Sequence, residues 1–263
     1  MKKKYLIIIF FFFNSCAYFD EAEEILPGKR ENVFKFEDDI IVKSNKRIKI
    51  DKSLSVDSWS QQYQNERNHL FHFKSKSKLS LKKKLKLNDI AFDKIDHVTI
   101  PVFDSNNVYY ADNDFNIYST SLDNGKINWI VKLENEKIEN LPFIGGLSLH
   151  KNELFITSGL GNIYSINAEN GKILWKKKLL VQFSRPPLVF KNKIIVVSDD
   201  NQTFALNTKD GNLMWSHVGN LEEVSIIGGS KPVVTENIVI ISYSSGEIYA
   251  LDHNDGTLIW FDN

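Results

Sequence analysis

Cysteine is almost absent from this chain: Cys16 is the single cysteine among 263 residues. Without a second cysteine, no internal disulfide can form. An excess of one charge is absent too, because Lys and Arg together number 33 and Asp and Glu together number 33. This balance gives no reason to expect nucleic acid or an acidic substrate as a partner. A content of 42% hydrophobic and 25% charged residues is ordinary for a globular fold that buries a core.

Long hydrophobic runs are also absent, apart from the nine residues 5–13, which follow three lysines. This run is about half of the roughly 20 residues that span a bilayer, so it predicts a signal peptide. Ser15 and Cys16 stand just after it, and this order resembles a bacterial lipoprotein signal, in which the cysteine sulfur is acylated. We therefore expect residues 1–15 to be the signal peptide and Cys16 to carry the lipid. An ordinary secretory signal and an uncleaved anchor are the alternatives.

Residues 16–57 predict a lipidated N-terminus and a tether. The acidic residues Asp20, Glu21, Glu23 and Glu24 form a solvated cluster, and Pro27-Gly28 breaks any helix. An acyl anchor would hold the domain that follows, residues 58–263, near a membrane.

A lysine-rich stretch, residues 74–87, alternates Lys with Ser and then places Leu at even spacing. A period of two predicts strands with one solvated face. A basic patch for anionic lipid headgroups is the alternative interpretation.

An internal repeat determines the predicted fold. Four tryptophans recur at separations of 46, 40 and 45 residues, and a glycine stands four positions before each of them. An Asn or Asp precedes each glycine, and such pairs favour tight hairpin turns because both residues tolerate positive φ. A short polar side chain four positions before each glycine can bond backbone N–H groups in the turn. The tryptophans are Trp129, Trp175, Trp215 and Trp260; the glycines are Gly125, Gly171, Gly211 and Gly256; the polar residues are Ser121, Asn167, Asn207 and Asp252.

Each repeated phrase is preceded by a further apolar strand, and each unit begins at a proline. The strands are expected at residues 108–111, 154–157, 194–198 and 238–243, and the prolines are Pro101, Pro142, Pro187 and Pro232. A unit of 40 to 46 residues thus has three clear strands and room for a fourth, with no helical period between them. Such a unit is one blade of a β-propeller, and the repeated Trp would cover the adjacent blade.

The predicted fold class is therefore all-β, a propeller with tryptophan-docking repeats. About four blades fill residues 98–263, whereas a ring of seven or eight blades at about 40 to 45 residues each needs a longer chain. An array that does not close leaves a blade face and strand edges exposed. We expect this chain to be part of a seven- or eight-bladed ring.

The repeated phrase resembles the tryptophan-docking repeat of quinoprotein-type propellers. This family has two well-known branches, the pyrroloquinoline-quinone-dependent dehydrogenases and the BamB lipoproteins of the outer-membrane β-barrel assembly machinery. The resemblance to the BamB branch covers nearly the whole chain. It includes the Cys16 signal, the Leu-Pro-Gly-Lys-Arg lead-in at residues 26–30, the segment around Trp59 and the run over residues 183–260.

The resemblance to BamB implies a noncatalytic scaffold without a cofactor. It would lie at the periplasmic face of the outer membrane, anchored through Cys16, and dock on a BamA-type subunit. In the family an interblade loop carries an Arg after apolar residues, which here implies Val181, Phe183 and Arg185 as partner contacts. The alternative for Arg185 is a salt bridge inside the propeller rim. Some members add acidic contacts where this chain has Gly228-Gly229-Ser230.

The rival prediction is a quinone-dependent dehydrogenase, which holds its cofactor and Ca²⁺ in the central funnel. These enzymes commonly carry a vicinal cysteine pair, which this chain lacks. The candidate acids Asp199, Asp200, Glu222 and Glu223 fall in expected turns, where solvated loop charge is the simpler interpretation. Fold alone does not decide between the branches.

Other motifs carry little chemistry. His69 and His72 are three residues apart but the remaining histidines show no metal-ligand spacing, and Gly159-Leu160-Gly161 lacks a third glycine. A third hypothesis is a propeller that binds polysaccharide through surface aromatic residues. The candidates for that role are Tyr63, Phe71, Phe73 and Tyr110.

Overall fold

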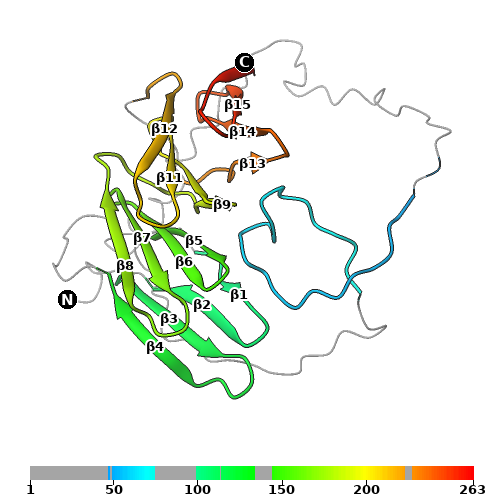
Figure 1. Cartoon of the computed structure of the whole chain (residues 1–263), viewed down its shortest axis with the longest axis vertical. Coiled ribbons are helices and arrows are strands. Elements are labelled where there is room, and N and C mark those ends of the chain that lie inside the picture. Colours follow the sequence, from blue (N-terminus) through cyan, green and yellow to red (C-terminus); the bar gives the residue numbers. More distant parts are fainter. Residues whose placement is uncertain (1–46, 48, 75–98, 113, 134–143, 223–226) are drawn as a thin grey trace, which may run out of the picture. The chain divides into compact units, whose positions relative to one another are not determined.

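A computed structural model describes residues 47, 49–74, 99–112, 114–133, 144–222 and 227–263. The chain divides into two units, residues 1–49 and residues 50–263, and all the described sheets belong to the second (Figure 1). Cys16, most of the predicted tether and nearly all of the lysine-rich stretch lie outside the described residues. Within the described residues no helix is present that could cross a membrane.

Among the described residues, sixteen strands form four antiparallel sheets of four strands each, in chain order: β1-β2-β3-β4, β5-β6-β7-β8, β9-β10-β11-β12 and β13-β14-β15-β16. We call these sheets blades 1 to 4. The bounds are β1 Val102–Phe103, β2 Asn107–Ala111, β3 Asn116–Ser121, β4 Ile127–Lys132, β5 Ile144–His150, β6 Glu153–Ser158, β7 Asn162–Asn167, β8 Ile173–Lys178, β9 Leu188–Phe190, β10 Lys193–Val197, β11 Gln202–Asn207, β12 Leu213–Val218, β13 Val233–Val234, β14 Ile238–Ser242, β15 Ile248–Asp252 and β16 Leu258–Asp262.

This architecture confirms the predicted all-β fold, a partial β-propeller. The four strands expected upstream of the repeated phrases match β2, β6, β10 and β14 to within one residue at each end. Pro101, Pro187 and Pro232 each stand just before the first strand of a blade, while Pro142 lies outside the described residues.

The hydrophobic cores lie between the blades. One cluster joins Tyr109 of blade 1 to Tyr164 of blade 2, and a second joins blades 2 and 3 around Phe155 and Leu206. A third cluster joins blades 3 and 4 and contains Trp215. A blade that is covered on both faces buries consecutive residues, which explains why β10 is buried along its whole length.

The hairpin turn before each Trp differs from the two-residue turn that the Asn-Gly and Asp-Gly pairs predict. Only the glycines have positive φ, from 69° to 78°. Each glycine N–H donates to the carbonyl oxygen four residues earlier at 2.9 Å, so the turn is wider, and the strand register shifts beside it. The predicted side-chain contact to the turn backbone is confirmed; for example, Lys209 N–H donates to Asn207 Oδ1 at 2.9 Å.

A segment outside the sheets, residues 59–68, runs along the first strands of all four blades. We call it the axial segment. Trp59 pairs with Phe103 of β1, and the carbonyl oxygen of Ser60 accepts from Leu149 N–H of β5 at 2.7 Å. The side chain of Gln61 donates to the carbonyl oxygen of Val189 in β9 at 2.9 Å. The carbonyl oxygen of Glu66 accepts from Val234 N–H of β13 at 2.9 Å. The axial segment therefore contacts the first strand of each of the four blades.

Candidate protein-docking surface

Three of the four repeated tryptophans lie against the following blade. A Cβ added to Gly171 would lie 2.9 Å from the ring of Trp129. A Cβ added to Gly211 or Gly256 would lie 2.8 Å from the ring of Trp175 or Trp215, respectively. Glycine is required there, because any side chain would displace the indole.

The indole N–H groups bind the next blade at equivalent positions. Trp129 donates to the carbonyl oxygen of Ala168 at 3.0 Å, Trp175 to that of Thr208 at 2.9 Å and Trp215 to that of His253 at 3.1 Å. Each acceptor lies three residues before the glycine that the ring covers. The glycine and the carbonyl together form a seat for the Trp of the preceding blade.

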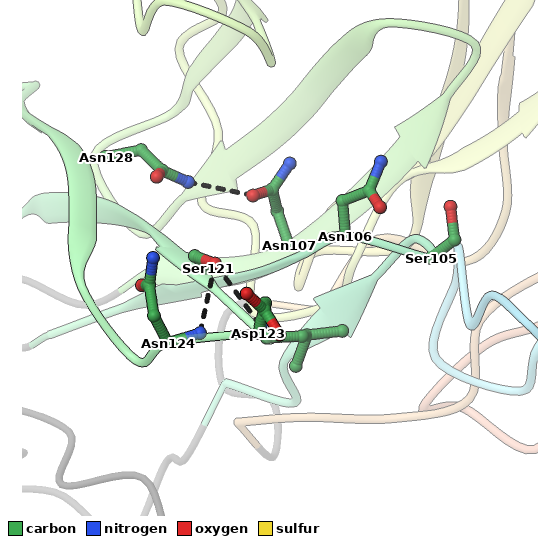
Figure 2. Close-up of a pocket in the computed structure, with 8 residues that line it drawn as sticks. Ser105, Asn106, Asn107, Ser121, Asp123, Asn124 and Asn128 are labelled. Atoms are coloured by element: carbon green, nitrogen blue, oxygen red, sulfur yellow. Dashed lines mark hydrogen bonds between the residues drawn. The ribbon is translucent and has the colours of Figure 1, made fainter.

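The corresponding turn of blade 1 borders a polar hollow (Figure 2). Its lining residues are Ser105, Asn106, Asn107, Ser121, Leu122, Asp123, Asn124 and Asn128. Asn128 Nδ2 donates to Asn107 Oδ1 at 2.8 Å and to Ser119 Oγ at 3.1 Å, so its amide group is engaged by neighbouring side chains. The hollow offers amide and hydroxyl groups and one carboxylate, a set that carries no evident catalytic chemistry.

The loop between blades 2 and 3 holds the three predicted partner contacts. Leu180 is 96% exposed, whereas Phe183 is fully buried and Arg185 is 4% exposed. Phe183 packs in the core between these blades and meets Phe204 edge to face, with ring centroids 6.4 Å apart. Val181 is half-buried in the same cluster. Leu180, which sequence reasoning did not select, is the fully exposed apolar residue of this loop.

Arg185 reaches into the loop between blades 3 and 4. Its Nη1 donates to the carbonyl oxygen of Ser242 at 3.1 Å, and its Nε donates to that of Gly228 at 3.4 Å. A Cβ on Gly229 would lie 2.4 Å from Nε, so only glycine allows this placement. Burial lowers the pKa of Arg185, and the charge of Asp199 opposes that shift. The guanidinium therefore links the two interblade loops.

Ser184 strengthens the same link. Its hydroxyl contacts Asp199 Oδ1, and the Gly228 N–H donates to that hydroxyl at 2.7 Å. The role of Arg185 and Phe183 as partner contacts stays a prediction, but their burial sets a condition on it. Either the loop opens on binding, or these residues shape the loop while Leu180 makes the contact. Gly229 matters here because a side chain at that position would displace the guanidinium of Arg185.

Further apolar residues project from the second loop. Leu221 is 64% exposed and Ile227 is 48% exposed. The docking surface is defined here as Leu180, Leu221 and Ile227, on the two loops that Arg185 connects. Exposed apolar residues that gather on a surface are typical of protein-binding sites.

The described candidate acids each accept hydrogen bonds from neighbouring side chains. Asp200 accepts from Ser198 and Gln202, and Glu222 accepts from Ser244 beside Asn201. No cluster of His, Cys, Asp and Glu suited to a metal occurs among the described residues. Glu223 lies outside them.

The remaining motifs have structural explanations. His69 and His72 do not lie on a helix; His72 Nδ1 contacts the carbonyl oxygen of Asp51 at 2.9 Å. Gly159 and Gly161 lie in the turn between β6 and β7. Of the aromatic residues proposed for polysaccharide, Tyr110 is 2% exposed and stacks on Tyr118, with ring centroids 4.9 Å apart, so its ring is not available. Tyr63, Phe71 and Phe73 are partly exposed.

Comparison with known protein families places the chain in a family. The model of the family described as outer membrane protein assembly factor BamB matches residues 113–263. No curated protein sequence matches the chain.

Solved structures share the fold. BamB from Moraxella catarrhalis has 20% sequence identity and a TM-score of 0.56, over 64% of this chain and 50% of that one. A europium-containing methanol dehydrogenase has 17% identity and a TM-score of 0.58, over 78% and 48%. The computationally designed protein Ika8 has 18% identity and a TM-score of 0.51, over 62% and 48%. The chain thus spans about half the length of the structures that it matches.

Proposed function

We propose a function from one premise: this chain belongs to the family of the outer membrane protein assembly factor BamB. The proposed function is that of a noncatalytic scaffold in outer-membrane β-barrel assembly. It binds a BamA-type subunit, and the lipid on Cys16 anchors it at the periplasmic face of the outer membrane.

The exposure of Leu180 carries the proposal. A leucine that is 96% exposed gains little from the fold, yet its loop is held in place by the buried Phe183 and Arg185. Burial of a leucine side chain by a partner contributes about 1.5–3 kcal/mol. Together with Leu221 and Ile227, it offers a partner exposed apolar side chains.

The axial segment supports a scaffold over an enzyme. A quinone-dependent dehydrogenase of this fold would hold its cofactor in the central funnel. In this chain the inner edges of all four blades are hydrogen-bonded to residues 59–68. The likeness to methanol dehydrogenase concerns the fold and carries no activity to this chain.

The docking surface is tested by Leu180→Glu. A buried carboxylate in the interface would reduce capture of the BamA-type subunit from detergent-solubilised membranes by at least tenfold. Thermal unfolding should not change, because the side chain is exposed. Ile130→Glu is the matched control, since Ile130 of β4 is 51% exposed but lies on an outer strand.

Two results would contradict the proposal. Capture that is equal for Leu180→Glu and the unchanged chain would place the contact elsewhere. Dye reduction with an alcohol or aldose after addition of pyrroloquinoline quinone and Ca²⁺ would favour the enzyme.

A further inference from the structure

The axial segment contacts each blade separately, which makes it a common connection among sheets that otherwise meet only their neighbours. Its contacts to β1, β5 and β13 are backbone hydrogen bonds, and its contact to β9 passes through the side chain of Gln61. Backbone pairing of this kind depends little on side-chain identity. The contact to blade 4 is different, because it adds a charged side chain.

Lys231 fastens the axial segment to blade 4. The side chain is 1% exposed, and its Nζ donates to Gln61 Oε1 at 2.9 Å and to the carbonyl oxygen of Asn65 at 2.9 Å. In return, Asn68 Nδ2 donates to the carbonyl oxygen of Lys231 at 3.1 Å. Gln61 also contacts Val189 of β9, so a single side-chain network joins the axial segment to blades 3 and 4.

The buried amine has little opposite charge around it. Glu66 of the axial segment is the charged group that acts on Lys231, and it only partly offsets the burial, which lowers the pKa of Lys231 to about 7. Arg67 of the axial segment and Glu236 of the β13–β14 turn are exposed, and the guanidinium of Arg185 lies at Gly229, two residues before Lys231. A lysine in such a site is neutral over much of the range in which a solvated lysine is charged.

We propose that residues 59–68 form a releasable tie across the blades, and that the protonation state of Lys231 controls how firmly the tie is fastened to blade 4. The two acceptors, Gln61 Oε1 and the carbonyl oxygen of Asn65, match the two N–H groups of the neutral amine, whereas the charged amine has a third N–H to donate. Only the charged form bears the cost of removal from water.

The direction of the response follows from proton linkage. When the tie opens, Lys231 enters water and holds its proton up to a pKa of about 10.4. Between about pH 7 and pH 10 the open form therefore binds more protons than the closed form, so closure becomes more favourable as pH rises. Below about pH 7 both forms are protonated, and closure is at its weakest.

Lys231 and Ile227 belong to the same connection between blades 3 and 4. Gly229, against which Arg185 lies, is two residues before Lys231. Opening at Lys231 would loosen the two loops that carry Leu180 and Ile227. This consequence rests on the proposed function, whereas the tie itself does not.

Hydrogen exchange of the full chain tests the tie directly. The Leu149 and Val234 N–H groups donate to carbonyl oxygens of the axial segment, so their protection reports its opening. After correction for intrinsic exchange, we expect the opening constant at Val234 to fall up to about tenfold per pH unit between pH 7 and pH 10. The internal reference is an amide that is hydrogen-bonded within one blade, such as the Gly219 N–H, which donates to the carbonyl oxygen of Asn201.

Matched variants separate the lysine from general effects of charge. Lys231→Met should abolish the pH response at Val234, while Lys209→Met, on an exposed turn, should retain it. Glu66→Gln keeps the lysine but removes the opposing carboxylate, so the response should begin at a lower pH. Glu66→Gln also tests the proposal if Lys231→Met fails to fold. A Val234 opening constant that stays flat from pH 7 to pH 10 in the unchanged chain would overturn the proposal, as would an unshifted onset in Glu66→Gln.

Subunit capture at pH 7 and pH 9 distinguishes the two proposals. A pH response in exchange without one in capture would leave the tie intact and disprove its link to the docking surface. Loss of capture at both values would count against the proposed function alone.

Discussion

Trp215 and Trp260 occupy the same position in two copies of the same hairpin, yet their surroundings differ. Trp215 is 7% exposed and donates its indole N–H to His253 of blade 4, whereas Trp260 is 43% exposed on β16. The neighbouring positions follow the same trend, because all five residues of β16 are exposed. The repeat therefore specifies the hairpin, but the blade beside it determines whether the Trp becomes part of a core.

The largest expected effect comes from removing the two rings in turn. Trp215→Ala should lower the free energy of unfolding by about 3–5 kcal/mol, because it leaves a cavity between blades 3 and 4. Trp260→Ala should cost less than about 1 kcal/mol, since its ring already meets solvent. Urea unfolding at equilibrium measures both. Equal costs would mean that burial against the next blade contributes nothing.

Arg185→Glu extends the comparison from apolar to charged contacts between blades. From sequence alone this substitution would weaken subunit capture and leave thermal unfolding unchanged. Burial against the carbonyl oxygens of Gly228 and Ser242 predicts instead a loss of about 3–5 kcal/mol, because a buried carboxylate would face acceptors and Asp199. Arg67→Glu, at an exposed position, is the control and should change stability by less than about 0.5 kcal/mol. Unchanged unfolding of Arg185→Glu would show that the guanidinium is free to reach a partner.

A third comparison is between two glycines of blade 4, Gly256, which the indole of Trp215 covers, and Gly246. Gly256 and Gly246 both have positive φ, 78° and 93°, but a Cβ on Gly256 would lie 2.8 Å from Trp215, whereas nothing lies within 4 Å of one on Gly246. Gly246→Ala should cost about 1–2 kcal/mol from backbone strain. Gly256→Ala should cost about 2–4 kcal/mol, since displacement of the indole adds to that strain.

A double-mutant cycle checks why Gly256→Ala should cost more than Gly246→Ala. In a Trp215→Ala background, Gly256→Ala should cost no more than Gly246→Ala, because the ring that it would displace is gone. A difference that persisted without the ring would assign the cost to the turn itself.

Sequence patterns predicted the blades well but not the burial of Arg185 and Lys231 or the exposure of Leu180, for physical reasons. The strands and the Trp–Gly spacing are local signals, since hairpin pairing and turn chemistry depend on residues close in sequence. The burial of Arg185 depends on Gly229, 44 residues later, and that of Lys231 depends on Gln61, 170 residues earlier. Only the exposure of Leu180 distinguishes it from the apolar residues beside it, and no local pattern contains that information.

The amino-acid sequence by itself determined four units of hairpin, glycine turn and Trp, and with them the all-β propeller class. Tertiary structure alone decided which indoles, which arginine and which lysine are buried. It also decided that residues 59–68 contact the first strand of each blade. The reason is that turn geometry and strand pairing are satisfied within a few residues, whereas burial and charge depend on whatever part of the chain packs alongside.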